Sequence, residues 1–490
     1  MLHVFLFSAG FAVHVPVADA AWYYVPLPSI WYDHDLQFKN NIEALRLQLP
    51  AGAPLVHPRY DQFVTPTGHV ADWFSIGPAL TWAIPFVLVA YLLGPLGNSG
   101  TNPVLFATVD LAASATFLLG MYLCTFWLAR RFGLAVAASA TAVTWVLSPL
   151  LDSAYTEPGV SHVPSATFSI GFLLAWEATR RDSRWSRYLV MGIIAGLAMT
   201  MRWQNVILLV FPIVTEGQRL LALVHGRDGA GITSQLRLVS IAALGTLIGF
   251  APQMVVWWIV FGSPVTMPQG SGFMHWLQPE ILSTWFASYY NGVFTWEPLA
   301  AVGLAGLVLF WKRDPALAAG ALVVFALQTY VNASAGDWFG GGGFGPRRFD
   351  SLVPVFALGV GVVLVRLNSI GRIAAVTASA AWMWVHWVLL THVVPHREEW
   401  LPGDAMQLAR ESFPVWTVNI ADLAGRVGAY SLSVWKDPGL AVFPGSPLSA
   451  LAGIQGDYLV PPVLLLLFGT LSTAVICAGA IHWLARSGWD

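Results

Sequence analysis

The sequence predicts an all-α polytopic membrane protein with about twelve transmembrane helices, and three observations lead to this prediction. The 490 residues are 56% hydrophobic and only 10% charged, with a mean hydropathy of +0.64, whereas an ordinary soluble domain is about 25% charged. Many apolar runs approach the ~20 residues that cross a ~30 Å hydrocarbon core as a helix. None shows the alternating pattern of about ten residues that is typical of an outer-membrane barrel strand.

Thirteen apolar runs are separated by turn residues and charges. The run at 76–97 contains Pro78, Pro85 and Pro95 and almost no polar anchor, so we interpret it as a juxtamembrane or re-entrant helix on the outer side. The other twelve then cross the membrane, and their short basic connections face the cytoplasm by the positive-inside rule. The runs are 2–18, 76–97, 104–129, 134–150, 163–178, 188–201, 203–223, 236–261, 298–311, 315–334, 350–366, 372–392 and 459–485.

This topology divides the chain into three parts. Residues 1–392 form the main transmembrane region, whose first outer loop spans 19–103. Residues 393–458 form a polar outer loop or small lid, and 459–490 hold the last transmembrane helix and a cytoplasmic tail. The run at 2–18 could instead be a signal peptide that ends near "VADA", although it lacks the basic n-region of such peptides.

Composition excludes several classes of function. The two cysteines, Cys124 and Cys477, each lie inside an apolar run, which excludes a disulfide framework and a zinc site. The net charge of -2 provides no basic stripe for a nucleic-acid partner. Most acidic residues fall on the predicted outer side. Because acids are weak topology signals, this excess indicates chemistry on the outer face.

The first outer loop begins with three acids. Asp19 lies where the first run leaves the bilayer; partial desolvation there would make it a general base, or it could cap the following helix. Asp33 and Asp35 in "WYDHDLQF" could contact a substrate or bind a divalent cation. They could instead cap the amphipathic stretch "LQFKNNIEALRLQL" through the helix dipole.

Two further outer connections hold candidate residues. "LLDSAYTEPGVSHVP" contains Glu157 and His162. Glu157 precedes Pro158, so it could be a first-turn acid of the next helix, or a partly buried carboxylate that meets a cation or a hydroxyl-bearing ligand. Arg202 in "MTMRWQN" occupies a short outer turn, against the positive-inside rule, which favours an anionic partner.

The stretch "GDWFGGGGFGPRRFD" at 336–350 is the most distinctive. Five glycines occupy six positions from Gly340 to Gly345, and backbone without side chains lets a ligand approach closely. Arg347 and Arg348 follow and offer bidentate pairing to phosphate or carboxylate oxygens. The alternative is a flexible loop whose arginines bind lipid headgroups.

Together these stretches resemble the C-type (GT-C) membrane glycosyltransferases, which include the lipid A aminoarabinose transferases and the protein O-mannosyltransferases. The resemblance extends to about residue 366. It rests on the acid after the first span, "FSIGPALTWAIPF", "YTEPGVSH", "AMTMRWQNVILLVFP" and "DWFGGGGFGPRRF". It implies that a sugar carried on polyprenyl phosphate is used on the outer side of the membrane. By position, Asp19 is the first-loop acid that acts at the acceptor, and Glu157 is a second functional acid.

The chain departs from this group at two places. The first-loop motif is usually two adjacent acids or Asp-Gly, but here Ala20 and Ala21 follow Asp19. Where aminoarabinose transferases place a lysine before the juxtamembrane helix, this chain has Asp72, Trp73 and Phe74. We therefore expect the donor phosphate to bind Arg202, Arg347 and Arg348.

The expected reaction is an inverting single displacement on the periplasmic side of a bacterial inner membrane. The leaving phosphate needs no general acid, whereas the acceptor hydroxyl needs a carboxylate base. No cofactor is expected, and the acceptor is a lipid, a glycan or a protein. A monophosphate donor does not demand a metal ion, although Asp33 and Asp35 permit one. Aromatic side chains of the first loop are expected to stack on the sugar; these are Trp22, Tyr23, Tyr24 and Trp31.

Two other functions stay open. A transporter or flippase of lipid-linked sugars would need polar residues along a path through the membrane, and Glu216 is the one evident charged candidate within a run. No pair of inverted repeats supports this function. A non-catalytic membrane scaffold would explain the altered first-loop motif.

Overall fold

The computed structural model describes residues 14–49, 63–94, 100–287, 291–340, 343–388, 425 and 427–429. Most of the predicted span at 2–18, nearly all of the outer segment 393–458 and the last span at 459–485 therefore lie outside the described residues. Gly341 and Gly342 of the glycine-rich stretch also lie outside them. The predicted number of twelve spans is thus not tested.

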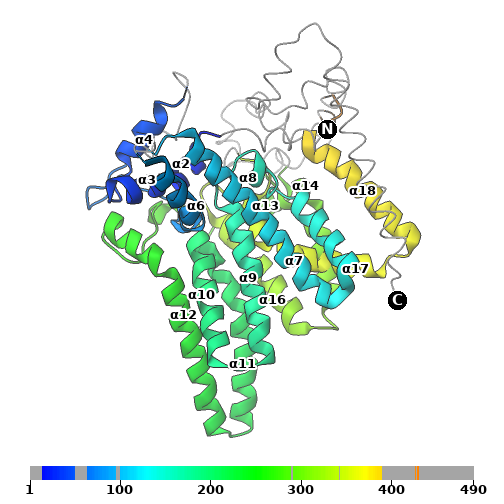
Figure 1. Cartoon of the computed structure of the whole chain (residues 1–490). Helices are drawn as coiled ribbons and strands as arrows, with labels where there is room; N and C mark the ends of the chain where they lie inside the picture. The colour runs from blue at the N-terminus through cyan, green and yellow to red at the C-terminus, as the bar shows by residue number, and fades with distance from the viewer. Residues whose placement is uncertain are drawn as a thin grey trace.

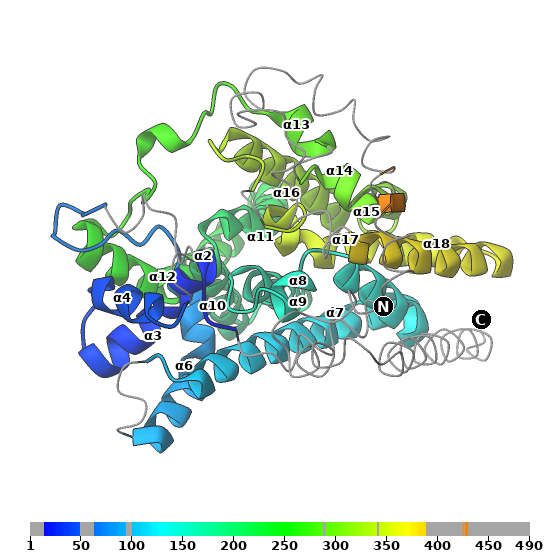
Figure 2. The same cartoon turned by 90° about the horizontal axis from the view of Figure 1, so that it is seen from above.

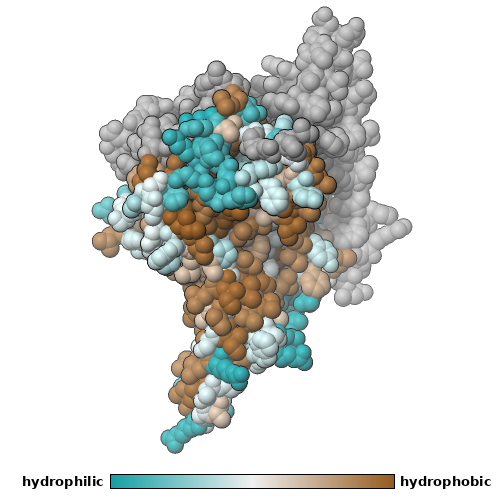
Figure 3. All heavy atoms as spheres, turned by 60° about the vertical axis from the view of Figure 1, so that its left-hand side comes forward, coloured by the Kyte–Doolittle hydropathy of each residue, from teal (hydrophilic) through white to brown (hydrophobic). Residues whose placement is uncertain are grey.

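The described chain is helical, and its only β pairing consists of isolated bridges, Val64 with Val70 and Met274 with Ala335. Five helical stretches are long and apolar enough to cross a membrane, which confirms an α-helical polytopic protein. On the face that Figure 3 shows, apolar side chains cover the middle of the body, and hydrophilic ones gather near its upper end and at its lower tip. The five stretches are Pro103–Val146, Trp203–His225, Gly229–Phe261, Pro315–Ser334 and Arg347–Arg366.

Figure 1 shows how the elements are arranged. A group of short elements lies at the upper end, and the longer helices descend from it. The upper elements before α7 are α2 (Ala18–Tyr24), α3 (Pro26–Pro28), the π turn η1 (Ser29–Asp33), α4 (Lys39–Arg46) and α6 (Gly77–Leu93). Those that follow are α7 (Pro103–Val146), α8 (Asp152–Tyr155), α9 (His162–Arg181), α10 (Trp185–Met201), the 3₁₀ turn η3 (Trp203–Leu209), α11 (Val210–His225) and α12 (Gly229–Phe261). The rest are η4 (Ser271–Phe273), α13 (Ile281–Phe286), α14 (Val293–Trp296), α15 (Pro298–Phe310), α16 (Pro315–Ser334), η5 (Arg347–Leu352), α17 (Val353–Arg366) and α18 (Ser369–Val388).

The element α7 contains two of the predicted spans. Its backbone leaves helical geometry at Gly133, where φ is 76° and ψ is 163°, at the end of the predicted "ARRFG" connection. The ring centroids of Phe117 and Trp145 are 5.6 Å apart, which an unbroken helix of that length does not allow. The chain therefore reverses near Gly133, and the predicted runs 104–129 and 134–150 pack against each other.

The helix α6 covers the predicted juxtamembrane run. It has 17 residues with Pro85 inside, which corresponds to about 25 Å of helix at 1.5 Å per residue. Seen from above, it runs outward from the neighbourhood of α2 (Figure 2). Its short length and outward course favour the predicted juxtamembrane position.

Close packing of α10 on α12 depends on two pairs of glycines, each pair spaced by four residues. A Cβ atom at Gly192 or Gly196 would overlap backbone carbonyls of α12, and a Cβ atom at Gly245 or Gly249 would overlap those of α10. Small residues at this spacing let two membrane helices approach along their backbones. The two helices therefore form a rigid unit that carries Arg202 at the upper end of α10.

Charged connections meet at the lower end of the bundle. The Arg180 guanidinium donates two bonds to the Asp314 carboxylate, at 2.7 and 3.0 Å, and Arg131 forms an ion pair with Glu177. The Arg313 guanidinium donates to the Arg131 carbonyl oxygen at 3.3 Å. These contacts confirm that the predicted connections 129–133, 178–188 and 311–315 lie together.

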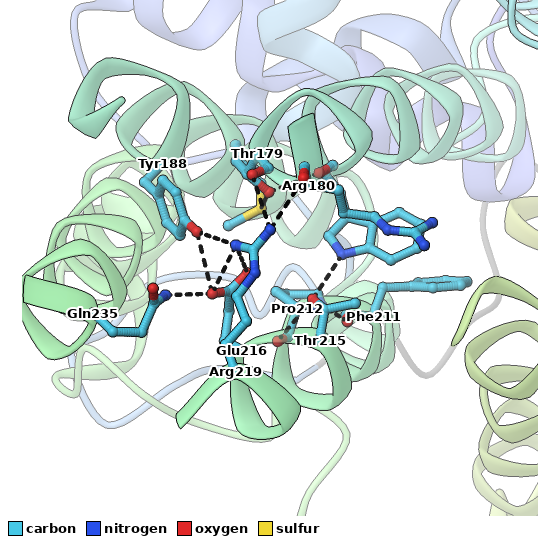
Figure 4. Close-up of polar contacts among 11 residues, drawn as sticks. Thr179, Arg180, Tyr188, Phe211, Pro212, Thr215, Glu216, Arg219 and Gln235 are labelled. Atoms are coloured by element: carbon cyan, nitrogen blue, oxygen red, sulfur yellow. Dashed lines mark hydrogen bonds and ion pairs between the residues drawn. The ribbon is translucent and has the colours of Figure 1, made fainter. Parts of the chain in front are cut away.

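Figure 4 shows a polar network at the same end, centred on Glu216. Its carboxylate accepts hydrogen bonds from the Tyr188 hydroxyl at 3.1 Å, from the Arg219 guanidinium at 3.0 Å and from the Gln235 amide. Arg219 also donates to the carbonyl oxygen of Arg180 at 3.2 Å. Glu216 thus joins α9, α10, α11 and α12, and this bonding explains the buried charge without a transport path.

Candidate active site

A cavity of about 760 Å³ is lined by residues of several elements, and Figure 1 shows that the labelled ones among them, such as α2 and α8, lie at the upper end of the bundle. Most of its walls come from six separate parts of the chain: residues 14–23, residues 73–75, the loop before α9, the turn after α10, residues 269–274 and the stretch 335–348. Seven of the ten residues predicted to form the site line this cavity. They are Asp19, Tyr23, Glu157, His162, Arg202, Arg347 and Arg348.

Asp19 lies in the first turn of α2, where the helix dipole favours a negative charge. Its carboxylate oxygen Oδ2 is 3.2 Å from Nη2 of Arg347, and 32% of the side chain is exposed. An acid from one end of the chain and a guanidinium from the far side of the bundle thus meet in one cavity.

Glycines of the loop before η5 make room for Arg347 and its neighbours. A Cβ atom at Gly343 would overlap the Arg347 guanidinium, and one at Gly345 would lie 2.7 Å from Pro149. Gly345 also has a φ of +63°, which side chains disfavour. At these two positions the glycines accommodate protein groups, and this differs from the predicted direct approach to a ligand.

Arg348, the second arginine of this loop, is also held by an acid. Its Nη2 lies 2.5 Å from Oδ2 of Asp337, whose side chain is 41% exposed. The Arg348 carbonyl oxygen accepts a bond from the Gln328 amide at 2.8 Å. Arg347 and Arg348 therefore both present ion-paired guanidinium groups to the cavity.

Arg202 follows the last residue of α10, with an extended backbone at φ −151° and ψ 124° that turns it out of the helix. Its Nη1 is 2.8 Å from Nδ1 of His162 and 3.3 Å from the Arg347 carbonyl oxygen. The same His162 nitrogen is 2.8 Å from that carbonyl oxygen. Arg202 and His162, predicted from separate motifs, are therefore in direct contact.

Glu157 does not begin a helix, so the interpretation as a first-turn acid is wrong. It follows α8, and α9 begins five residues later at His162. The side chain is exposed to the cavity and makes no hydrogen bond or ion pair with any residue the structure describes. The surrounding cavity walls partly desolvate the Glu157 carboxyl group and raise its pKa; the Arg347 guanidinium opposes this rise, and the Asp19 carboxylate adds to it.

Tyr23 is the one aromatic residue predicted for the sugar that lines the cavity. Its hydroxyl donates to Ser161 Oγ at 2.8 Å, and its ring meets Phe74 edge-on with centroids 5.0 Å apart. Burial raises the pKa of Tyr23 to about 12, so the hydroxyl stays protonated at neutral pH. The other aromatic residues that line the cavity were not predicted for the sugar: Trp73, Phe74, Trp203 and Phe273.

Tyr24, Asp33 and Asp35 lie outside the cavity, so the geometry does not support their predicted contact with substrate. The Tyr24 ring packs between Phe86 and Phe106 and its hydroxyl donates to the Gly100 carbonyl. Asp33 accepts bonds from side chains in the first turn of α4, those of Asn40 and Asn41, at 3.0 and 2.9 Å.

Asp35 likewise bonds to its own loop, where it accepts from Ser29 Oγ at 2.9 Å and from the Gln37 amide N–H at 3.0 Å. Asp33 and Asp35 thus brace the first loop and the start of α4. The prediction that they cap this helix is wrong, because Phe38 holds the N-cap position without a side-chain cap and no acid lies in the first turn.

Three buried or cavity acids were not predicted. Asp337 pairs with Arg348, while Asp350 and Glu297 are almost fully buried. These acids escaped prediction for a simple reason. Asp337 and Asp350 stand on either side of glycines and arginines that are the evident features of their stretch, and a single acid forms no repeating pattern that would point to it. Among the residues that the structure describes, no group of three or more His, Cys, Asp or Glu side chains is arranged to hold a metal ion.

No protein-family model matches the sequence, and no curated protein sequence matches it. Solved structures are similar to it over most of its length. ArnT from Cupriavidus metallidurans, bound to undecaprenyl phosphate, matches with 14% identity and a TM-score of 0.45, covering 88% of this chain and 75% of that one.

The oligosaccharyltransferase AglB from Archaeoglobus fulgidus, in complex with an inhibitory peptide and a dolichol-phosphate, matches with 12% identity and a TM-score of 0.43. The match covers 94% of this chain, which spans 58% of that protein. Both proteins are C-type glycosyltransferases.

Proposed function

We propose that this protein is a glycosyltransferase that moves a sugar from a polyprenyl-phosphate donor to an acceptor in the cavity at the upper end. The observation that carries the proposal is the contact between Asp19 and Arg347, 3.2 Å apart, in a cavity that Arg202 and Arg348 also line. A carboxylate base and a cluster of guanidinium groups are the two devices that this transfer needs. The cavity opens on the periplasmic face of a bacterial inner membrane.

The arginines bind the donor phosphate. During transfer the bond between the anomeric carbon and the phosphate oxygen breaks, and the phosphate keeps the electron pair. Guanidinium groups stabilise this charge, and each can pair two phosphate oxygens. Because the phosphate is a good leaving group, no proton donor is needed on that side.

Asp19 acts at the acceptor. The acceptor hydroxyl oxygen forms the new bond to the anomeric carbon, and its proton passes to the Asp19 carboxylate. A single displacement of this kind inverts the anomeric centre. Glu157, which is exposed to the cavity without a protein partner, accepts hydrogen bonds from sugar hydroxyls and orients the sugar. The acceptor is a lipid, a glycan or a protein.

Transfer from a synthetic polyprenyl-phosphate sugar to a candidate acceptor in proteoliposomes tests the proposal. Asp19→Asn removes the base while keeping the shape of the side chain. We expect it to lower transfer roughly 100- to 10,000-fold with an unchanged unfolding temperature. Asp33→Asn, an exposed acid of the same loop that lies outside the cavity, is the matched control and retains activity.

The same proteoliposomes separate the other two functions. A flippase moves the labelled donor across the bilayer without forming a glycosylated product, and a scaffold does neither. Full transfer activity of a folded Asp19→Asn variant contradicts the role of Asp19.

A further inference from the structure

Three helical segments end side by side where the charged connections meet. They are the first run of α7, which stops before the reversal at Gly133, and the helices α15 and α17, which end at Phe310 and Arg366. Phe132 packs between them. Its ring centroid is 6.4 Å from that of Phe310 in α15, and a Cβ atom at Gly361 of α17 would lie 3.0 Å from the same ring. The three ends therefore form one continuous surface.

Four exposed cations occupy this surface, and we call them the basic seam: Arg130, Lys312, Arg313 and Arg366. The Arg313 guanidinium donates across to α7, to the Arg131 carbonyl oxygen at 3.3 Å. The Arg366 guanidinium donates to the Val362 carbonyl at 2.8 Å and across to α15, to the Leu309 carbonyl at 3.5 Å. These bonds between helices hold the cations close to one another.

No described carboxylate neutralises the basic seam. The Asp314 carboxylate accepts two bonds from Arg180 and one from the Leu317 amide, and Glu177 forms its ion pair with Arg131. Bonds to carbonyl oxygens at helix C-termini account for part of the donors of Arg313 and Arg366. A guanidinium carries five N–H donors, so most of them are left for an external acceptor.

Exposed apolar side chains lie beside these cations in the chain. Leu134 follows the reversal of α7, and Leu309 and Trp311 flank the end of α15; about half or more of each side chain is exposed. A small soluble anion makes no use of such a surface. A phospholipid does, because its phosphate meets the cations while its acyl chains cover the apolar groups, and tryptophan favours this depth of the bilayer.

We propose that the basic seam is a binding site for an anionic phospholipid of the adjoining leaflet. The phosphodiester oxygens accept from the guanidinium groups of Arg313 and Arg366, and Arg130 and Lys312 add positive charge. Basic residues between membrane helices bind lipid headgroups in this manner. The bound lipid joins the ends of α7, α15 and α17. The inference does not depend on the proposed function, because none of the four cations lines the cavity.

Titration of the full-length protein in a non-ionic detergent with phosphatidylglycerol, followed by native mass spectrometry, tests this inference. Arg313→Gln combined with Arg366→Gln removes two charges of the basic seam. We expect the Kd for the first bound lipid to rise roughly 10- to 30-fold. Phosphatidylcholine with the same acyl chains is expected to bind the wild type at least as weakly as the variant binds phosphatidylglycerol.

A charge-matched control separates a local site from general attraction. Arg227→Gln combined with Arg237→Gln also removes two exposed charges, in the loop between α11 and α12 and at the start of α12. That loop lies at the lower tip, apart from α17 (Figure 1). We expect this variant to bind phosphatidylglycerol like the wild type. Equal weakening in the two double variants would mean that net charge alone attracts the lipid, and the inference would be wrong.

A second variant keeps the test open if the first does not fold. Arg130 and Lys312 make no hydrogen bond or ion pair with any residue that the structure describes, so Arg130→Gln combined with Lys312→Gln leaves the fold intact and should also weaken binding. Glycerol phosphate, which has the phosphate but no acyl chains, distinguishes a lipid from a soluble anion. We expect no competition at millimolar concentrations. Competition at the affinity of the lipid, or wild-type affinity in both neutralised variants, would contradict the inference.

Discussion

The residues that depart from the charge distribution expected of a membrane protein were the best guide to the cavity. In the predicted topology Arg202, Arg347 and Arg348 oppose the positive-inside rule, and in the structure all three line one cavity with the acids Asp19 and Glu157. A charge on the unexpected side of a membrane protein needs a compensating partner. These side chains were therefore predictable from sequence, although their mutual distances were not.

Predictions that rested only on closeness to Asp19 in the sequence were less reliable. Tyr23 and Tyr24 are adjacent in α2, but successive side chains of a helix point about 100° apart. Tyr23 therefore faces the cavity, while Tyr24 packs between Phe86 and Phe106. The direction of a short helix relative to its neighbours depends on packing that a single sequence does not reveal.

Substitution of Arg347 distinguishes bidentate binding from simple charge. Arg347→Lys keeps a positive charge but loses the planar fork, and we expect a drop of about tenfold in kcat/KM for the donor. Arg347→Ala also leaves Asp19 without its partner, and we expect a loss of about 100-fold or more. Steady-state kinetics with varied donor concentrations measure both losses. Equal activities of the two variants would mean that Arg347 does not bind the phosphate.

The raised pKa of Asp72 predicts how the free energy of unfolding depends on pH. Burial raises the pKa of Asp72 to about 8, although the Phe74 amide that bonds to it opposes the rise. The unfolded chain loses this proton near pH 4, whereas the folded protein keeps it to about pH 8. The folded state thus binds more protons between these values, and the free energy of unfolding falls as pH rises from about 4 to about 8.

The variant Asp72→Asn lacks this dependence because its side chain is neutral at every pH. We expect its unfolding temperature to exceed that of the wild type by a few degrees at pH 8, with a smaller difference at pH 5. Glu43→Gln, on the exposed side of α4, controls for the loss of one acid. A constant difference at both pH values contradicts the assignment.

At the scale of elements, apolar runs and charged connections were predictable, and helix starts near prolines were not. The reversal at Gly133 and the clustering of 129–133, 178–188 and 311–315 follow from composition and charge. Pro158 and Pro164 both resemble the proline of a first helical turn. The helix begins at His162, so Pro164 fulfils that role and Glu157 remains in the loop.

The glycine contact between α10 and α12 allows a direct test of packing. Gly196→Ala places a methyl group against the Thr246 carbonyl oxygen, and we expect a loss of about 1–3 kcal/mol in unfolding free energy. Gly217→Ala in α11 meets open space and is neutral or slightly stabilising, because alanine favours helices more than glycine does. Thermal unfolding in detergent compares the two, and equal stabilities exclude a close helix contact.

At the scale of the whole molecule, the elements that carry the cavity residues lie at one end, and the helix ends that carry the basic connections lie toward the other (Figure 1). This separation predicts sidedness. In a background without cysteine, Leu277→Cys at the cavity end reacts with a membrane-impermeant thiol reagent from the periplasm. Arg227→Cys, in the loop between α11 and α12, reacts only after the inner membrane is permeabilised. Both positions are exposed, and labelling from the same side contradicts the orientation.

Under the proposed function, the ion pairs of the cavity have a consequence for turnover. Asp19 bonds to Arg347 and Asp337 bonds to Arg348, so an incoming donor phosphate would exchange with carboxylates that belong to the protein. When the spent lipid carrier leaves, these carboxylates return as counter-ions, and no bare cationic cluster remains to retain the product. A site built in this way trades tight capture of the donor for rapid release of its carrier.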